Sequence, residues 1–457
     1  MNFDRVRTLI LQQAIRGRLV THIDTEKPVH VNNKVTLNVP YELPETWLWV
    51  RGDEILEFIR GVTFPASAKQ SSNSEGTVRC LTTGSVQRLH NPVADVFIQS
   101  SYVKKDRQYL QKNDIVISTA NSKELVGKCI RWKNVDSKVS FGGFLTVARS
   151  KNSEIDSNFV YYVFQSLFYS RYFANLSTQT TNIANLSNAL LSGVLFPVPP
   201  IEEQLRIVTK LDEAFAEIDR AEKAYQELQT LSGVLRGQIL HEAIQGKLVP
   251  QLDSEGAVEQ IGDAPEEVPF TIPEKWKWTC LEKVADFYNG YAFKSSSYVD
   301  QSLNQVIRLG NVKMNRLELE VKPVFVSDKV SDSQSLFHIK PNDILVTMTG
   351  TKNKKDYFYS TLVLEADLKD RKLLLNQRVG CIRAKEKVLP EFLCLVLQEK
   401  TIRDGVLAQE TGTANQGNIS SSAIKFIKVP IPPKDEQKRI VDSINSLMEQ
   451  IEALSRK

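Results

Sequence analysis

Four loops rich in glycine, arginine, lysine, asparagine and threonine recur at matching places in the two halves of this 457-residue chain. Such side chains hydrogen-bond to base edges and grip phosphates, and glycine lets a backbone approach a phosphate closely. One such loop alone could equally be a solvated loop, but four in register favour a nucleic-acid-binding face. The candidate contact residues of the first half are Arg60, Gly61, Thr63, Arg79, Asn121, Ser122, Lys123, Thr180 and Asn182. Those of the second half are Asn289, Gly290, Lys294, Arg308, Asn311, Lys313, Thr351, Lys352, Asn353, Thr413 and Asn415.

The residues around these loops repeat more closely than the loop interiors. The tryptophan segment that begins at Pro44 returns at Pro273, and one constant shift then aligns Arg79 with Arg308. By contrast, the interior 65–70 has no likeness to its counterpart 294–299. A shared frame with different contact loops is what two readers of two different targets would need.

The motifs of common catalytic chemistry are absent from the sequence. There is no phosphate-binding Gly-x-x-x-x-Gly-Lys-Ser/Thr loop, no Asn/Asp-Pro-Pro-Tyr/Phe tetrapeptide of adenine methyltransferases and no His-Glu-x-x-His motif. Among carboxylates, Asp114 recurs as Asp343 and Glu45 as Glu274, which we interpret as turn and cap residues. We therefore expect a chain without an active site or a metal site of its own.

The composition is that of an ordinary globular protein, with 42% hydrophobic and 25% charged residues. The net charge of +4 permits a nucleic-acid partner without demanding one. No long apolar segment is present, so we expect no membrane span and a cytoplasmic protein. Five scattered cysteines without Cys-x-x-Cys spacing predict buried thiols in a reducing compartment: Cys80, Cys129, Cys280, Cys381 and Cys394.

Two globular α/β regions, about 41–198 and 270–431, must position the candidate loops. Short β-rich runs at 114–118 and 343–347 are bounded by turn residues and predict strands. The apolar segments 158–167 and 390–398 predict buried helices.

A long helix is predicted to follow each globular region. After Pro199-Pro200, apolar residues recur in alternating steps of four and three from Ile207 to Leu228, and the same pattern runs from Ile440 to Leu454. Each seam alone could belong to an amphipathic helix on a globular core, but two matched seams favour an intramolecular antiparallel coiled coil. The first helix, from about 202 to 245, would be about 66 Å long.

A short motif shows that the repeat is circularly permuted. The segment 239–249, which ends the first repeat, has its copy at 10–20, whereas the second repeat ends without one. Gly17 and Gly246 in these copies are typical of the glycine that stops a helix. We therefore predict that the two termini meet and together complete the second long helix.

These motifs resemble the specificity subunit of type I restriction–modification systems. The resemblance rests on Pro-Glu-x-Trp-x-Trp at 44 and 273, Arg-Gly-Val-Thr-Phe at 60, Asn-Asp-Ile-Val-Ile at 113, the two Pro-Pro-x-x-Glu-Gln-x-x-Ile-Val helix starts, and Ala-Ile-Gln-Gly-Lys-Leu-Val at 243. It covers essentially the whole chain.

The resemblance implies an α+β fold in which two similar α/β target recognition domains are separated by two long antiparallel helices, with pseudo-two-fold symmetry. The expected parts are an N-terminal helical segment 1–40 that completes the second repeat, target recognition domains 41–198 and 261–431, the central long helix and spacer 199–260, and the C-terminal helix 432–457.

The resemblance also implies the function. Each domain would read one half of a bipartite, asymmetric site in double-stranded DNA, and the helices would set the spacer and dock two modification subunits. Those subunits would carry S-adenosylmethionine and methylate adenine N6, while restriction subunits would use ATP and magnesium; this chain would be non-catalytic. The alternatives are a DNA-binding protein that acts without partners and a protein scaffold with two ligand domains.

Overall fold

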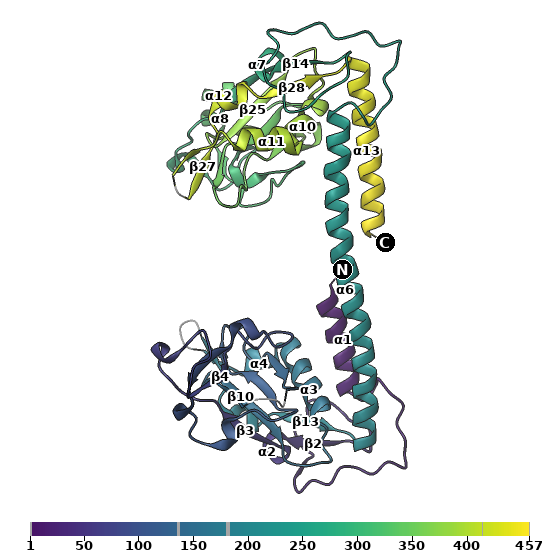
Figure 1. Ribbon diagram of the computed structural model, residues 1–457, viewed down its shortest axis with the longest axis vertical. Coiled ribbons are helices and arrows are strands. Elements are labelled where there is room, and N and C mark those ends of the chain that lie inside the picture. Colours follow the sequence, from purple (N-terminus) through teal and green to yellow (C-terminus); the bar gives the residue numbers. More distant parts are fainter. Residues whose placement is uncertain (1, 135–137, 180–182, 414, 457) are drawn as a thin grey trace. The chain divides into compact units, whose positions relative to one another are not determined.

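The computed structural model describes residues 2–134, 138–179, 183–413 and 415–456 and divides the chain into two compact units, Met1–Tyr225 and Gln226–Lys457 (Figure 1). Each unit combines several small sheets with helices. The long helix α6 (Ile201–Ile244) begins in unit 1 and ends in unit 2. The expected α+β fold of two similar units with long helices is confirmed, and the five-part division of the chain stays a prediction.

Unit 1 contains short helices and thirteen described strands. Its helices are α1 (Phe3–Ile15), α2 (Gly52–Ile55), α3 (Ser157–Tyr169), α4 (Tyr172–Leu176) and α5 (Asn188–Ser192), with 3-10 turns η1 (Ala66–Ala68), η2 (Pro92–Ala94), η3 (Ser100–Tyr102) and η4 (Asp106–Gln108). Its strands are β1 (Lys34–Val35), β2 (Leu48–Arg51), β3 (Leu56–Arg60), β4 (Thr77–Leu81), β5 (Val96–Gln99), β6 (Ile115–Ser118), β7 (Ala120–Asn121), β8 (Cys129–Arg131), β9 (Val139–Phe141), β10 (Leu145–Ser150), β11 (Thr178–Gln179), β12 (Ala184–Asn185) and β13 (Leu195–Val198).

Unit 2 repeats this plan with some additions. Its helices are α7 (Leu281–Val284), α8 (Asp328–Ser333), α9 (Glu365–Leu368), α10 (Pro390–Gln398), α11 (Lys400–Leu407), α12 (Ser421–Lys425) and α13 (Lys434–Arg456), with η5 (Ser295–Ser297), η6 (Leu309–Asn311) and η7 (Ser335–Phe337). Its strands are β14 (Lys277–Cys280), β15 (Ala285–Asn289), β16 (Tyr298–Val299), β17 (Asn304–Ile307), β18 (Val312–Lys313), β19 (Arg316–Leu317), β20 (Phe325–Val326), β21 (Ile344–Thr347), β22 (Thr349–Thr351), β23 (Ser360–Leu362), β24 (Lys372–Leu375), β25 (Val379–Ala384), β26 (Thr411–Gly412), β27 (Gln416–Asn418) and β28 (Lys428–Ile431). The predicted strands and buried helices are present as β6, β21, α3 and α10.

The sheets of the two units have matching strand orders. The four-stranded antiparallel sheet β3-β10-β6-β8 corresponds to β15-β25-β21-β23. In a second pair of sheets, β4 runs parallel to β9 and β17 runs parallel to β24. A third pair comprises the small sheets β11-β12-β7 and β26-β27-β22. The sequence repeat is therefore a repeat of sheet topology.

The recurring aspartates are turn residues, as predicted. Asp114 is 1% exposed and accepts two hydrogen bonds from Arg149, at 2.8 and 2.7 Å, while also accepting from a backbone N–H three residues earlier. Asp343 makes the same contacts with Arg383, at 2.7 and 2.8 Å. Each carboxylate fixes the turn before a central strand and neutralises a neighbouring arginine.

A buried glutamine anchors the start of each long helix to its own domain. Gln204 donates to the backbone carbonyls of Pro199 and Glu154 at 2.9 and 3.0 Å. Gln437, in α13, makes the corresponding bonds to the preceding proline and to Lys387. The glutamine of the Pro-Pro-x-x-Glu-Gln motif is thus a structural tie between helix and domain.

The predicted helix-stopping glycines are confirmed. Gly17 and Gly246 adopt left-handed conformations with φ of 67° and 73°, directly after the ends of α1 and α6. Backbone hydrogen bonds of the Schellman type close both ends. A Cβ atom at Gly17 would lie 2.5 Å from Pro44, and one at Gly246 would lie 2.4 Å from a proline, Pro273. The glycines therefore let each helix end pack on the tryptophan segment of its domain.

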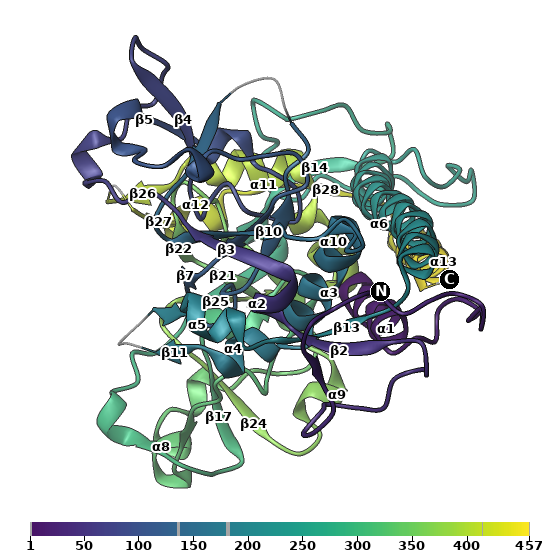
Figure 2. The same cartoon turned by 90° about the horizontal axis from the view of Figure 1, so that it is seen from below.

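The long helices pair in an antiparallel manner within each unit. In unit 2, α13 lies beside the later part of α6 in both views, with Ile244 and Ile440 in one core and Arg236 close to Glu452 (Figures 1 and 2). In unit 1, α1 lies along the earlier part of α6, where Arg7 contacts Asp219 at 2.9 Å.

The heptad seam of α6 is therefore covered by two different helices. Ile207 and Leu211 are fully buried, but Leu228 is 38% exposed. This arrangement agrees with the predicted coiled coil, in which the N- and C-terminal segments share the role of the second helix: α1 covers the part of the seam in unit 1, and α13 lies beside the part in unit 2. The predicted meeting of the termini concerns Met1 and Lys457, which lie outside the described residues, and it stays a prediction.

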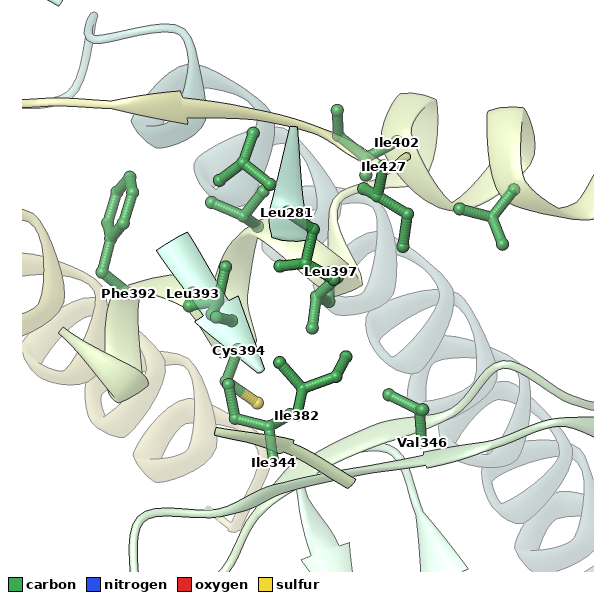
Figure 3. Close-up of a cluster of buried hydrophobic side chains, with 14 of the residues drawn as sticks. Leu281, Ile344, Val346, Ile382, Phe392, Leu393, Cys394, Leu397, Ile402 and Ile427 are labelled. Atoms are coloured by element: carbon green, nitrogen blue, oxygen red, sulfur yellow. The ribbon is translucent and has the colours of Figure 1, made fainter. Parts of the chain in front are cut away.

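The core of unit 2 forms between the sheet β15-β25-β21-β23 and the helices α10 and α11 (Figure 3). The apolar face of α10 packs on the inner residues of β21 and β25, which explains the apolar character of segment 390–398. The labelled side chains of this cluster are Leu281, Ile344, Val346, Ile382, Phe392, Leu393, Cys394, Leu397, Ile402 and Ile427.

The cysteines are unpaired, and four of the five are buried, as expected for core thiols. Burial raises the pKa of Cys80 and that of Cys394 to about 12. No helix among the described residues is long and apolar enough to cross a membrane. The same residues contain no cluster of three or more metal-ligating side chains.

Candidate nucleic-acid interface

The matched glycines Gly61 and Gly290 each touch a turn of their own unit. A Cβ atom at Gly61 would lie 2.2 Å from the carbonyl oxygen that opens the turn 142–144, here called the β9–β10 turn. At Gly290 the corresponding distance is 2.1 Å, to the turn 376–378, here called the β24–β25 turn. The close approach that we predicted for a phosphate is thus made by the chain itself.

Both turns are held by the same backbone hydrogen bonds. The N–H of Thr119 donates to the carbonyl of Phe144 at 2.9 Å, and the N–H of Met348 donates to the carbonyl of Arg378 at 3.1 Å. Each turn is also closed by a bond from the first residue of the next strand, at 2.8 Å in unit 1 and 2.9 Å in unit 2. The backbones of the two turns are therefore equivalent and fixed.

Each turn borders a cavity at the equivalent place in its unit, bounded also by the end of β4 or β17. The cavity of unit 1, about 480 Å³, is lined by Arg60, Val62, Thr63, Phe64, Ala66, Lys69, Leu81, Thr82, Thr83, Gly142, Gly143, Phe144 and Leu145. The cavity of unit 2, about 350 Å³, is lined by Phe293, Tyr298, Arg308, Leu309, Gly310, Asn311, Val321, Lys322, Asn376, Gln377 and Arg378. Each cavity is lined by two candidates of one and the same loop, Arg60 with Thr63 in unit 1 and Arg308 with Asn311 in unit 2.

Strand pairing corrects the alignment of Arg79 with Arg308. Leu81 pairs with the last residue of β9, and Ile307 pairs with the last residue of β24. Leu81 and Ile307 therefore occupy equivalent positions in the two units. Arg308 therefore corresponds to Thr82, three residues beyond Arg79. The constant shift failed because insertions and deletions between the strands change the register of the repeat.

The small three-stranded sheets bring two further candidate loops together in each unit. Asn121 pairs with Ala184 across β7 and β12, and Thr351 pairs with Gln416 across β22 and β27. The N–H of Lys352 also donates to the carbonyl of Asn415 at 3.3 Å. The loop after β6 or β21 thus lies beside the segment near the domain exit, as a shared binding face requires.

The candidates differ in how far they face solvent. Exposed are Arg60, Thr63, Lys123, Asn289, Lys294, Thr351, Asn353, Thr413 and Asn415. Half-buried are Arg79, Asn121, Ser122, Gly290, Arg308, Lys313 and Lys352, while Gly61 and Asn311 are buried. Thr180 and Asn182 lie outside the described residues.

Some candidate side chains are engaged within the protein. Asn311 is 2% exposed, and its amide donates to two backbone carbonyls, at 3.0 Å each, and accepts from the N–H of Arg308. Arg79 forms an ion pair with Asp95, whose side chain is 2% exposed. Asn289 accepts a hydrogen bond from Ser421 at 2.8 Å. Asn311 and Arg79 therefore support the candidate surface from beneath rather than forming it.

Sequence reasoning missed the exposed residues of the two turns. The Phe144 side chain is 66% exposed at the rim of the first cavity, and Gln377 and Arg378 are exposed at the rim of the second. No signal in the sequence could have found them, because the residues on either side of the turns, such as Phe141 and Leu375, also differ between the copies.

Comparison with known proteins agrees with the duplicated architecture. The family model described as the type I restriction modification DNA specificity domain matches residues 44–230 and again 273–457. The chain is 24% identical to the EcoKI type I restriction enzyme specificity subunit of Escherichia coli K12, over 89% of this chain and 83% of that one. It is also 24% identical to the MjaVIII specificity subunit of Methanocaldococcus jannaschii, over 90% and 88% of the two chains.

A solved structure shows the same fold. A chain from a study of complex assembly and conformational transition in the type I R-M system matches with a TM-score of 0.66 at 16% identity, over 91% of this chain and 94% of that one. Both copies of the family domain together span most of the present chain. The chain therefore belongs to the family of type I restriction modification DNA specificity domains.

Proposed function

We propose that this chain is the DNA-recognition subunit of a type I restriction–modification complex, in which each unit reads one half of a bipartite, asymmetric site. The observation that carries the proposal is the pair of equivalent cavities, built on one frame but lined by different side chains. Two units that share one architecture but present different side chains fit a DNA site whose two halves have different sequences. The family membership and the names of the curated relatives support the same function.

Contacts to DNA would come from the exposed candidates, and from the half-buried Arg308, around each cavity and on each three-stranded sheet. Arg60 and Arg308 have the guanidinium geometry that binds a guanine edge through two hydrogen bonds. Lys123 and Lys294 are exposed single charges that suit phosphate oxygens. With a net charge of only +4, the chain alone would bind DNA weakly, and bound partners would supply further contacts.

The long helices would serve as the ruler and as the dock for two modification subunits. At 44 residues, α6 is about 66 Å long, and one turn of B-DNA is about 34 Å. The part of α6 in unit 2 exposes Leu228, Leu231 and Leu235, by 38%, 66% and 48%. Contiguous exposed apolar side chains on one helix are typical of a protein-binding surface.

In this proposal the catalytic chemistry belongs to the partners. The modification subunits bind S-adenosylmethionine and methylate adenine N6, and restriction subunits use ATP and magnesium for translocation and cleavage. This chain supplies specificity and acts in the cytoplasm, where its DNA is. The bases read and the length of the spacer follow from the docked complex.

Domain exchange, with a co-expressed methyltransferase subunit as partner, tests the function. Replacing residues 43–196 with the corresponding domain of another system should change one half of the methylated site, as mapped by sequencing of methylated adenines. A change in both halves contradicts the modular proposal. A chain that co-purifies with no methyltransferase and shifts no DNA in gel electrophoresis contradicts the function itself.

Single arginines provide a finer test. Arg60→Ala or Arg308→Ala should weaken binding by about 1–3 kcal/mol and relax the preference at one base pair. The two alternatives, a partner-free DNA-binding protein and a protein scaffold, predict respectively tight binding without a methyltransferase and no binding at all.

Insertion into α6 tests the ruler. Four residues added after Gly233, an exposed position, should lengthen the unread spacer of the methylated site. The matched control places the same four residues after Gly256, in the segment beyond the end of α6, and should leave the spacer unchanged. An unchanged spacer in both variants would contradict the ruler.

A further inference from the structure

The equivalent turns present different side chains from the same rigid backbone. In unit 1 the turn contains two glycines followed by Phe144, whose ring is 66% exposed. In unit 2 the same places hold Asn376, Gln377 and Arg378, and the last two are exposed. Among the described residues, no carboxylate pairs with the Arg378 guanidinium. The fold uses the backbones of these turns and the buried side chain of Asn376, and it leaves the side chains of Phe144, Gln377 and Arg378 available.

The surroundings of each turn match the chemistry of its side chain. In unit 1 the cavity beside Phe144 has apolar walls from Val62, Phe64 and Leu81. A thymine methyl group is the apolar feature of the major groove, and phenylalanine is among the side chains that contact it. Arg60 and Lys69 also line this cavity, but its lining is mostly apolar, so the first turn offers an apolar contact beside a mostly apolar wall.

The second turn offers hydrogen-bond donors in a cationic setting. Arg308 and Lys322 line the same cavity as Gln377 and Arg378. The Arg308 guanidinium already donates to the carbonyl of Lys322 at 2.8 Å, which orients it toward that wall. Arginine binds the O6 and N7 acceptors of guanine, and glutamine binds the N6 and N7 groups of adenine.

We propose that these turns are base-reading elements of unlike chemistry: Phe144 contacts a thymine methyl group in one half-site, and Gln377 with Arg378 hydrogen-bonds to base edges in the other. This inference rests on the proposed function and names the residues that distinguish the two half-sites. The shared backbone sets where each reader lies, and the turn sequence sets what it reads.

Thymine-to-uracil substitution tests the first turn directly, because uracil lacks only the methyl group. A half-site with a methylatable adenine contains at least one thymine opposite it. In the complex of the full chain with its methyltransferase, uracil at one position should weaken binding about fourfold, the value of one buried methyl group. The Phe144→Ala complex should bind about tenfold more weakly and lose that uracil effect.

Leu37→Ala is the matched control for this experiment. Leu37 is 80% exposed in unit 1 and does not line the cavity, so its variant should keep both the wild-type affinity and the uracil effect. Because Phe144 is exposed, Phe144→Ala should also keep the wild-type melting temperature. The proposal for this turn is overturned if uracil has no effect at any position, or if the effect persists in Phe144→Ala.

Base-pair substitution tests the second turn. Arg378→Ala should weaken binding about tenfold to a hundredfold. It should also abolish discrimination between base pairs at one position, and that position should lie in the half-site that Phe144→Ala does not affect. Arg378→Lys should keep the charge without the two-pronged geometry and should restore affinity only in part. The control Lys400→Ala removes an exposed charge on α11 and should preserve discrimination at every base pair.

The possible outcomes separate this inference from the proposed function. A uniform loss of affinity in Arg378→Ala, with discrimination intact, would show a phosphate contact and overturn the base-reading role. A wild-type complex that prefers no sequence would instead contradict the proposed function. A wild-type complex that prefers its site, with both turn variants unchanged, would overturn only the present inference.

Discussion

Units 1 and 2 agree where the chain holds itself together and differ where it faces solvent. The Asp–Arg pair before the central strand, the glycine at the helix end and the glutamine at the helix start are the same in both. The cavities and the turns beside them are equivalent in backbone but lined by different side chains. Identity between the copies thus marks scaffold, and divergence marks candidate recognition surface.

The units also differ in how each domain is tied to a long helix. In unit 1, Arg88 of the β4–β5 loop pairs with Asp219 and Glu222 of α6, which Arg7 contacts as well. Unit 2 has a hydrogen bond between His241 of α6 and Glu399 instead, at 2.9 Å. The two domains therefore share their internal contacts, but each is held against α6 by a different set of polar contacts.

The largest effect should come from breaking the buried ion pair in either unit. Arg149→Met leaves the carboxylate of Asp114 buried without its partner, and Arg383→Met does the same to Asp343. Each variant should lose about 3–5 kcal/mol in the free energy of unfolding of its own unit. Denaturant titration with a probe in each unit measures the loss. If only one of the two variants lost stability, the frames of the two units would not be equivalent.

The helix-stopping glycines should give the next largest effect. Gly17→Ala or Gly246→Ala forces a left-handed backbone onto an alanine and places its Cβ against a proline, so each should cost at least about 1–2 kcal/mol. Gly237→Ala is the control, since this glycine lies within α6 with open space around it. That change should raise stability by about 0.5–1 kcal/mol. Thermal melting distinguishes the opposite signs.

The ion pairs of Arg88 with Asp219 and Glu222, which unit 2 lacks among its described residues, should contribute less to stability. Arg88 is 44% exposed, so Arg88→Ala should cost at most about 1 kcal/mol, whereas Arg7→Ala removes a buried partner of the same carboxylates and should cost more. Chemical denaturation measures both. Equal costs would mean that the ion pairs of Arg88 are as important as the packing of α1.

The smallest expected effect is a pH dependence confined to unit 1. Hydrogen bonds from Arg7 and Arg88 hold the pKa of Glu222 below its ordinary value. Its contribution to stability is therefore complete above about pH 4.3, the unfolded value, and is lost as pH falls through the lower folded value. Glu222→Gln should flatten this part of the stability profile of unit 1. A profile unchanged by the substitution would contradict the assignment.

Much of the frame could be predicted from sequence because it depends on local patterns. Glycine after a heptad seam, aspartate before a β-rich run and two long amphipathic segments each specify a conformation. The register around Arg79 and Arg308 could not be predicted, because insertions hidden in loops change the pairing of strands far apart in the chain. Phe144 was missed because a lone exposed phenylalanine has no sequence signature until its cavity is seen.

The pairing of α1 with α6 has a consequence for the order of biosynthesis. Arg7 and its partner Asp219 are 212 residues apart in the chain. At about 5–20 residues per second, roughly 10–40 s pass between their synthesis on the ribosome. During that interval Leu11 and Ala14 of α1 can pack only on α3, which belongs to the same core, and the side of α1 that faces α6 has no partner helix. Helix α1 is thus made well before the second of the two helices that cover it, and one side of it stays open to misassembly or to capture by a chaperone until α6 has emerged.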